Sequence, residues 1–138
     1  MLGEFELDKD LSIFCGEIGW LGEKISVSLD IDKDNKDSWT KAMNTLRKLF
    51  AQQEQMDTDF RAFAAEKLTA LANDWCEEED TAEISKKDFA GRISLMELTV
   101  TSGGSYKAYY DDDDMFLGHA VTVYGSIKKG VKDATIIG

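Results

Sequence analysis

The sequence predicts an α+β protein in which an antiparallel β-sheet of about five to six strands is packed on one face by two central helices. Three observations lead to this fold class. Apolar residues alternate with period two over the first 34 residues, switch to a helical period over residues 38–77, and return to period two after residue 80. The resulting order is ββαα(α)ββββ. The chain has no proline and no low-complexity linker, so residues 1–138 are expected to form a single domain.

Two strands are expected first, at residues 11–15 and 23–31. In the second of them, Ile25, Val27 and Leu29 fall on one face because side chains alternate along a strand. The connection between the strands contains Gly16, Gly19 and Gly22 and therefore predicts a tight hairpin or a bulge.

Two helices are expected next. Ser38 is a plausible N-cap, and Asp57 is the candidate cap of the second helix. Since no glycine or proline marks the break between them, we place a short turn near residue 56 and expect the two helices to pack together. The apolar stripes predicted to face the core are Trp39, Ala42, Met43, Leu46, Leu49 and Phe50, then Phe60, Phe63, Ala64, Leu68, Leu71, Ala72 and Trp75.

The last part of the chain predicts a short helix and a β-meander. Ser85 and Asp88 match the Ser-x-x-acid capping pattern, so a helix is expected to run through Phe89. Strands are then expected at residues 92–101, 106–110, 118–124 and 133–137, with hairpin turns at 102–105 and near 128–130.

Composition limits the possible functions. The net charge of −11 is too acidic for a protein that binds nucleic acids or anionic membranes in general, and it instead suits a basic partner. No apolar run approaches the roughly 20 residues that span a bilayer. The acidic N-terminus does not look like a signal peptide, and Cys15 and Cys76 form no metal-binding or redox motif, so a cytoplasmic protein with reduced thiols is expected.

The first candidate site is Asp30-x-Asp32-x-Asp34, which has the opening spacing of a calcium loop. The rest of that motif is missing, because Asn35 stands in place of the required glycine and Lys41 in place of the final glutamate. A solvated strand end is the simpler interpretation.

The second candidate site is the run Asp111, Asp112, Asp113 and Asp114, followed by His119, the only histidine. Adjacent carboxylates repel one another, which favours a solvated turn unless a cation or a basic protein neutralises them. His119 is either a general base beside a carboxylate or a structural residue whose ring forms a hydrogen bond across the sheet edge.

Other chemical signatures are weak. The sequence contains no phosphate-binding loop, no dinucleotide fingerprint and no HExxH motif, and we predict no cofactor. Tyr106 and Tyr110 share one strand face while Tyr109 lies on the other, so at least one of these tyrosines is expected to meet solvent or a partner.

The end of the chain has a distinctive pattern. An acidic turn leads into Met-Phe-x-Gly-His at residues 115–119, an alternating strand, a Lys-Gly turn and a final Asp-Ala-x-Ile-x-Gly at residues 133–138. This pattern resembles the bacterial domain of unknown function number 2262, although Leu117 stands where a larger aromatic residue is expected. The resemblance implies a small cytoplasmic bacterial protein and assigns no catalytic residues. Related small α+β domains look like immunity proteins in toxin–antitoxin-style loci.

Three functional hypotheses follow. The first is a non-catalytic, acidic protein-binding module, for example an immunity protein that neutralises a basic toxin. The second is a metal-dependent or acid/base enzyme centred on His119 and residues 111–114. The third is a self-associating structural domain, and either a monomer or a homodimer is compatible with the sequence. The candidate binding residues are Asp30, Asp32, Asp34, Tyr109, Asp111, Asp112, Asp113, Asp114 and His119.

Overall fold

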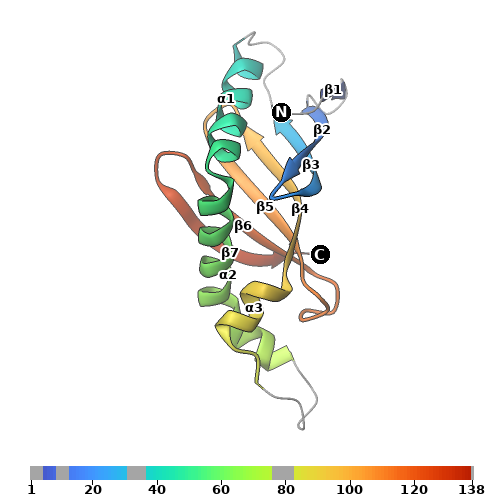
Figure 1. Ribbon diagram of the computed structural model, residues 1–138, viewed down its shortest axis with the longest axis vertical. Helices are drawn as coiled ribbons and strands as arrows, with labels where there is room; N and C mark the ends of the chain where they lie inside the picture. The colour runs from blue at the N-terminus through green and yellow to red at the C-terminus, as the bar shows by residue number, and fades with distance from the viewer. Residues whose placement is uncertain (1–4, 9–12, 31–36, 76–82, 138) are drawn as a thin grey trace.

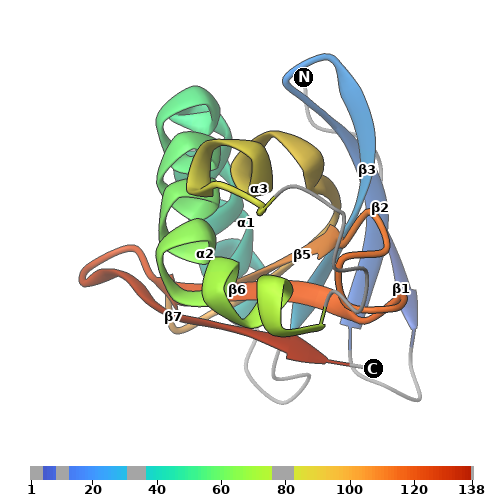
Figure 2. The ribbon, with the colours of Figure 1, turned by 90° about the horizontal axis from the view of Figure 1, so that it is seen from below.

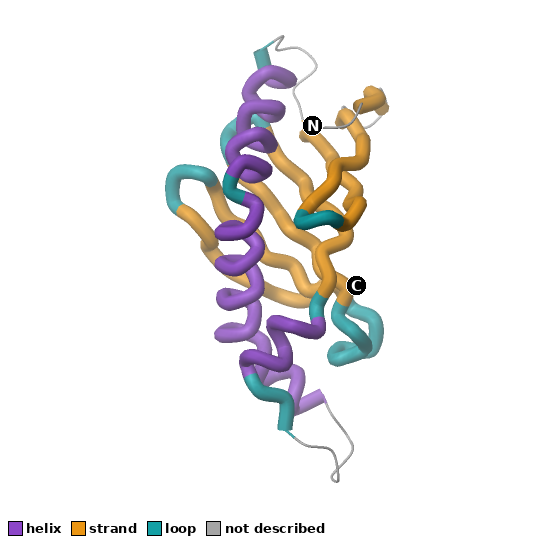
Figure 3. The backbone as a smooth tube through the Cα atoms, viewed as in Figure 1, coloured by secondary structure: helices purple, strands orange, loops and turns teal. Residues whose placement is uncertain are grey.

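The computed structural model describes residues 5–8, 13–30, 37–75 and 83–137. These residues form seven strands and three helices (Figures 1 and 3). The strands are β1 (Phe5–Asp8), β2 (Ile13–Trp20), β3 (Glu23–Asp30), β4 (Ser94–Thr101), β5 (Ser105–Asp111), β6 (Ala120–Ser126) and β7 (Gly130–Ile137). The helices are α1 (Ser38–Ala51), α2 (Gln53–Trp75) and α3 (Lys86–Arg92).

All seven strands belong to one sheet, in which they follow their order along the chain. The α+β class and the predicted order ββαα(α)ββββ are confirmed for β2 to β7, and β1 is an additional strand before the predicted pair, so the described sheet has seven strands rather than five to six. The sheet is mixed, however, because β3 and β4 pair in parallel while every other pair is antiparallel. The three helices lie between β3 and β4, and such a long crossover returns the chain in the same direction. The prediction of a purely antiparallel sheet was therefore wrong at this one pair.

The predicted tight hairpin near Gly22 is confirmed. Leu21 and Gly22 have φ values of 50° and 84°, the left-handed conformation of a two-residue turn that suits the twist of the flanking strands. The preceding strand is longer than expected, because β2 continues through Trp20, which is 2% exposed.

Helices α1 and α2 follow one another end to end along the sheet (Figure 1). The break falls at Gln52, whose amide bonds to the Leu49 carbonyl at 3.2 Å while its own carbonyl accepts from Met56 at 2.8 Å. The predicted break near residue 56 was thus placed too late, and the two helices do not form a packed hairpin. No glycine or proline marks the position in the sequence, so the error follows from the missing stop signal.

All three helices lie on the same side of the sheet (Figure 2), and the core fills the space between them. The other face of the sheet carries no described helix. Trp39, which the apolar stripe places in the core, is 38% exposed, because Ser38 takes the buried position in the first turn of α1. Ser38 is the first residue of the helix, and the N-cap is Asp37 rather than Ser38 as predicted. The core includes Val27, Leu29, Leu46, Leu49, Phe60, Ala64, Leu98, Val100, Ala108, Val121 and Val123, each at most 1% exposed. None of the described helices has the length and apolar character needed to cross a membrane.

Candidate functional site

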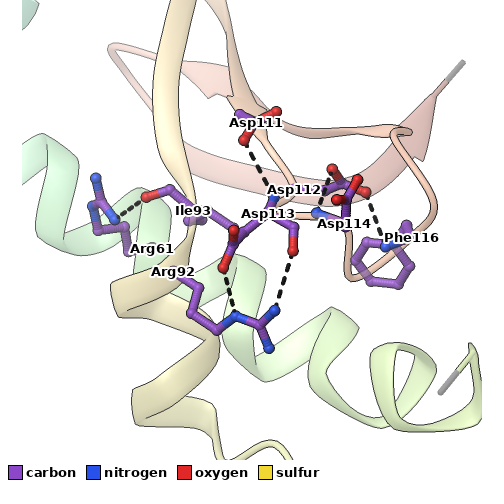
Figure 4. A network of polar contacts seen from close by, with 8 residues as sticks. All are labelled: Arg61, Arg92, Ile93, Asp111, Asp112, Asp113, Asp114 and Phe116. Carbon is purple, nitrogen blue, oxygen red and sulfur yellow. Dashed lines mark hydrogen bonds and ion pairs between the residues drawn. The ribbon is translucent and has the colours of Figure 1, made fainter. Parts of the chain in front are cut away.

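The aspartate run leaves the end of β5 and forms a loop that is organised by Asp112. The side chain of Asp112 is buried, at 2% exposure, and its carboxylate accepts three backbone N–H groups. Oδ1 accepts from Asp114 at 3.1 Å and Oδ2 from Phe116 at 2.9 Å (Figure 4). Oδ2 also accepts from Gly118 at 3.0 Å. One carboxylate therefore fixes the path of the chain between β5 and β6.

This loop contains an unusual concentration of left-handed backbone. Asp113, Asp114 and Leu117 have φ values of 49°, 59° and 58°, and Gly118 has 93°. L-residues other than glycine adopt this region at an energetic cost, so the surrounding hydrogen bonds must hold it in place. The consequence at the surface is that Leu117, a large apolar side chain, is 77% exposed.

The four aspartates have different roles. Asp113 is neutralised by Arg92, whose Nε donates to Oδ2 at 2.8 Å and whose Nη2 donates to the Asp113 carbonyl at 3.1 Å (Figure 4). The Asp111 carboxylate accepts the Asp113 amide at 3.3 Å. Within the described residues, neither Asp111 nor Asp114 forms an ion pair, and both are exposed. The run therefore offers two exposed carboxylates without an ion pair, Asp111 and Asp114, rather than four.

His119 belongs to the same loop. Its Nδ1 lies 2.6 Å from the Phe116 carbonyl oxygen, and because a carbonyl only accepts, Nδ1 carries the proton in this contact. Its ring packs edge-on against Trp75 with 5.3 Å between centroids, and Trp75 also packs against Phe116 at 5.6 Å. The imidazole therefore ties the loop to the end of α2, and the hydrogen bond lies inside the loop rather than across the sheet edge.

The remaining candidates do not gather into one patch. Asp30 pairs with Thr101 and Asp111 pairs with Ser94, so these two aspartates lie at opposite ends of β4. Seven residues of strand separate them, which corresponds to about 23 Å. Asp32 and Asp34 lie outside the described residues. Tyr109 is half-buried and shares the uncovered face of the sheet with Asp111, two residues along β5.

A buried polar network near the loop was missed by the sequence-based reasoning. Asp57 accepts the Tyr110 hydroxyl at 2.8 Å and Arg61 Nε at 2.7 Å. Arg61 Nη1 donates to the carbonyls of Ala90 and Ile93 at 2.7 and 2.5 Å, and the guanidinium lies 5.3 Å from the Tyr110 ring centroid. Asp57 is thus a buried residue inside α2, and its predicted role as a helix cap was wrong. The i,i+4 spacing of Asp57 and Arg61 was the only local signal.

The network has an electrostatic consequence for Tyr110. Burial raises the pKa of Tyr110 well above its ordinary value, and the neighbouring Asp57 carboxylate raises this pKa further, while Arg61 opposes the change. The phenol is therefore held as a neutral hydrogen-bond donor, which favours a structural role for the network.

A metal centre would need several ligands that converge on one point. Across residues 5–8, 13–30, 37–75 and 83–137, no group of three or more His, Cys, Asp or Glu side chains is placed to hold a metal ion.

The structure is thus that of an acidic α+β protein whose helices cover one face of a mixed sheet. The connection between β5 and β6 contains the run of four aspartates. The chain belongs to the bacterial family described as "Uncharacterized protein conserved in bacteria (DUF2262)", whose model matches residues 1–136. This confirms the resemblance noted in the last part of the sequence. Neither the curated proteins nor the solved structures contain a match to the chain.

Proposed function

We propose that the protein is a non-catalytic binding module that recognises a basic protein partner through residues 111–118, here called the recognition loop. The observation that carries this proposal is the structural role of the Asp112 side chain. Its buried carboxylate holds the recognition loop in a strained conformation that leaves Asp111, Asp114 and Leu117 exposed. Strained backbone persists where the surrounding structure enforces it, and it is common at sites that contact ligands.

The chemistry of the recognition loop indicates the kind of partner. An exposed apolar side chain beside two unpaired carboxylates suits a surface that combines an apolar pocket with lysine or arginine side chains. Tyr109 extends this surface onto the uncovered face of the sheet. The net charge of −11 favours rapid association with a basic molecule. An immunity protein that neutralises a basic toxin is the biological form we propose, and it places the protein in the cytoplasm, where the free Cys15 thiol stays reduced.

The alternative of an enzyme centred on His119 has less support. In the described part of the chain, the only hydrogen bond of the imidazole is to a backbone carbonyl, and the ring forms no ion pair with a carboxylate. Self-association through the outer edge of β7 is the other alternative. A molar mass by light scattering that stays monomeric as concentration rises would remove it.

The proposal is tested by capturing partners from the lysate of the native host and then measuring association with the captured protein. We expect D111N/D114N to slow association several-fold in a salt-dependent manner, because rim charges act mainly on the association rate. Leu117→Ser is expected to speed dissociation. The matched control is E23Q/E54Q, which removes the same charge from exposed carboxylates elsewhere. Equal slowing by the control would show that only net charge matters and would contradict a specific loop.

A further inference from the structure

A hollow of about 350 Å³ lies between α1 and the turns that connect β4 to β5 and β6 to β7. We call it the lysine hollow. Its charged lining residues are all lysines, and no acidic residue of the described chain lines it. Asn44, Thr45 and Ser126 add uncharged polar groups. The four lysines are Lys41, Lys48, Lys128 and Lys129.

These four ammonium groups are not neutralised within the described residues. The cations that form ion pairs there are Arg61, Lys67, Lys86 and Arg92. Like charges gathered in one hollow repel one another, and this repulsion opposes folding unless an anion is bound. In a protein whose net charge is −11, four unpaired lysines around one hollow are therefore the feature that most needs an explanation.

The walls of the lysine hollow are fixed by hydrogen bonds. The amide of Ile127 donates to the Gly104 carbonyl at 2.9 Å and joins the two turns. The Lys129 amide donates to Ser126 Oγ at 3.1 Å. On the opposite wall, Thr45 Oγ1 lies 3.3 Å from the Thr101 carbonyl and holds α1 against the end of β4. The lysines are thus carried by backbone that is already in place before any ligand arrives.

A second hollow of about 680 Å³ adjoins the lysine hollow, since Ser126 and Lys129 line both. Its lining adds Lys107 and Lys132, the tyrosines Tyr106, Tyr109 and Tyr124, and a single carboxylate, Asp30. Both volumes fall in the usual range for small-molecule sites, about 300–1,000 Å³. A ligand with an anionic end in the first hollow has room for an organic part beside tyrosines in the second.

We propose that the lysine hollow binds a small ligand that carries two or more linked phosphate groups. Lysine ammonium groups each offer three donors to phosphate oxygens and act as point charges. Several of them around a compact hollow match a short phosphate chain better than a single carboxylate. An extended nucleic-acid backbone fits less well, because the chain as a whole carries a net charge of −11. The lysine hollow shares no residue with the recognition loop, and its ligand does not depend on the function proposed for that loop. Of the second hollow, only Tyr109 also belongs to the proposed partner surface.

The probe is sodium tripolyphosphate, titrated into the full chain at physiological salt with the heat of binding recorded. We expect saturable one-to-one binding that weakens as salt increases. K48Q/K129Q is expected to weaken binding by about tenfold or more, since it removes two charge-assisted hydrogen bonds to phosphate oxygens. The control K24Q/K87Q removes the same charge from exposed lysines outside both hollows and should change affinity by less than about twofold.

Thermal unfolding of each variant checks that it is folded, and K41Q/K128Q serves as a second test pair. Absence of saturable binding by the unmodified protein overturns the proposal, and so does equal weakening by the control pair. Tighter binding of a DNA oligonucleotide than of tripolyphosphate also overturns it. ATP is titrated in the same way as a second ligand. Tighter binding of ATP than of tripolyphosphate supports a nucleotide that uses both hollows, and equal binding supports the phosphate chain alone.

Discussion

At the scale of single residues, Asp112 holds the most demanding position in the molecule. Its two oxygens accept three amides in a buried setting, and an asparagine can supply only one of those oxygens. We expect Asp112→Asn to lower the free energy of unfolding by about 2–3 kcal/mol, because the amide nitrogen would face backbone donors. Urea denaturation measures this change.

The control for Asp112 is its neighbour Asp114, which is exposed. Asp114→Asn should change the free energy of unfolding by less than about 0.5 kcal/mol, as is usual for surface positions. If both substitutions had the same small effect, the loop would not depend on the buried carboxylate.

Tyr110 is expected to make the protein less stable as the pH rises into the alkaline range. The folded protein raises the pKa of this phenol, through burial and through Asp57, so it holds the proton more tightly than the unfolded chain does. The resulting stability is complete below the ordinary tyrosine pKa of about 10 and is lost as the pH rises above it. We expect Tyr110→Phe to lower the free energy of unfolding near neutral pH by about 1–3 kcal/mol. Above pH 10, the free energy of unfolding of this variant should fall less steeply with pH than that of the unmodified protein.

Urea denaturation at several pH values between about 8 and 11 measures this difference. Tyr109→Phe is the matched control, because Tyr109 lies on the other face of the same strand and takes no part in the Asp57 network. An alkaline decline of equal steepness in Tyr110→Phe and in the unmodified protein would contradict the role given to Tyr110.

At the scale of elements, the β6–β7 hairpin depends on one glycine. The pairing shifts register between Tyr124 and Gly125, and the backbone of β7 approaches Gly125 closely at that point. A Cβ on Gly125 would meet the Gly130 carbonyl oxygen and lie 2.8 Å from Val131 Cα. Since backbone cannot move aside as a side chain can, we expect Gly125→Ala to destabilise the protein by about 1–3 kcal/mol.

Gly91 provides a control of opposite sign. It lies inside α3, and an added Cβ would meet nothing within 4 Å. Gly91→Ala should therefore raise the free energy of unfolding by about 0.5–1 kcal/mol, because alanine favours the helix. Thermal or urea unfolding of the two variants together tests both statements. A tolerated Gly125→Ala would show that the hairpin can open at no cost.

At the scale of the whole molecule, the features that the sequence predicted are those with local causes. Ser85 caps α3 as expected, accepting the Asp88 amide at 3.0 Å, and the turn at Gly22 was visible from glycine spacing. Asp57 was misinterpreted because its partner Tyr110 is 53 residues away along the chain. In the candidate site, the sequence shows four equal aspartates, and only the folded loop separates the buried Asp112 from its exposed neighbours.

Charge is also arranged over the whole molecule. The exposed carboxylates of the recognition loop begin at Asp111, the last residue of β5, whereas the lysine hollow lies at the turns beside the first residue of β5. An acidic region and a basic region therefore occupy opposite ends of one strand. Such an arrangement orients an approaching charged molecule before contact, so the net charge alone does not describe what the protein attracts.

The parallel pairing of β3 with β4 also determines the order in which the chain can be assembled. Strands β1–β3 and strands β4–β7 are each meanders of neighbouring segments, so each group can form from contacts that are close in sequence. Joining the two groups must wait until the ribosome has released all three helices and β4. Until then, β3 presents an open strand edge, which is the point at which a newly made chain is most exposed to pairing with another copy.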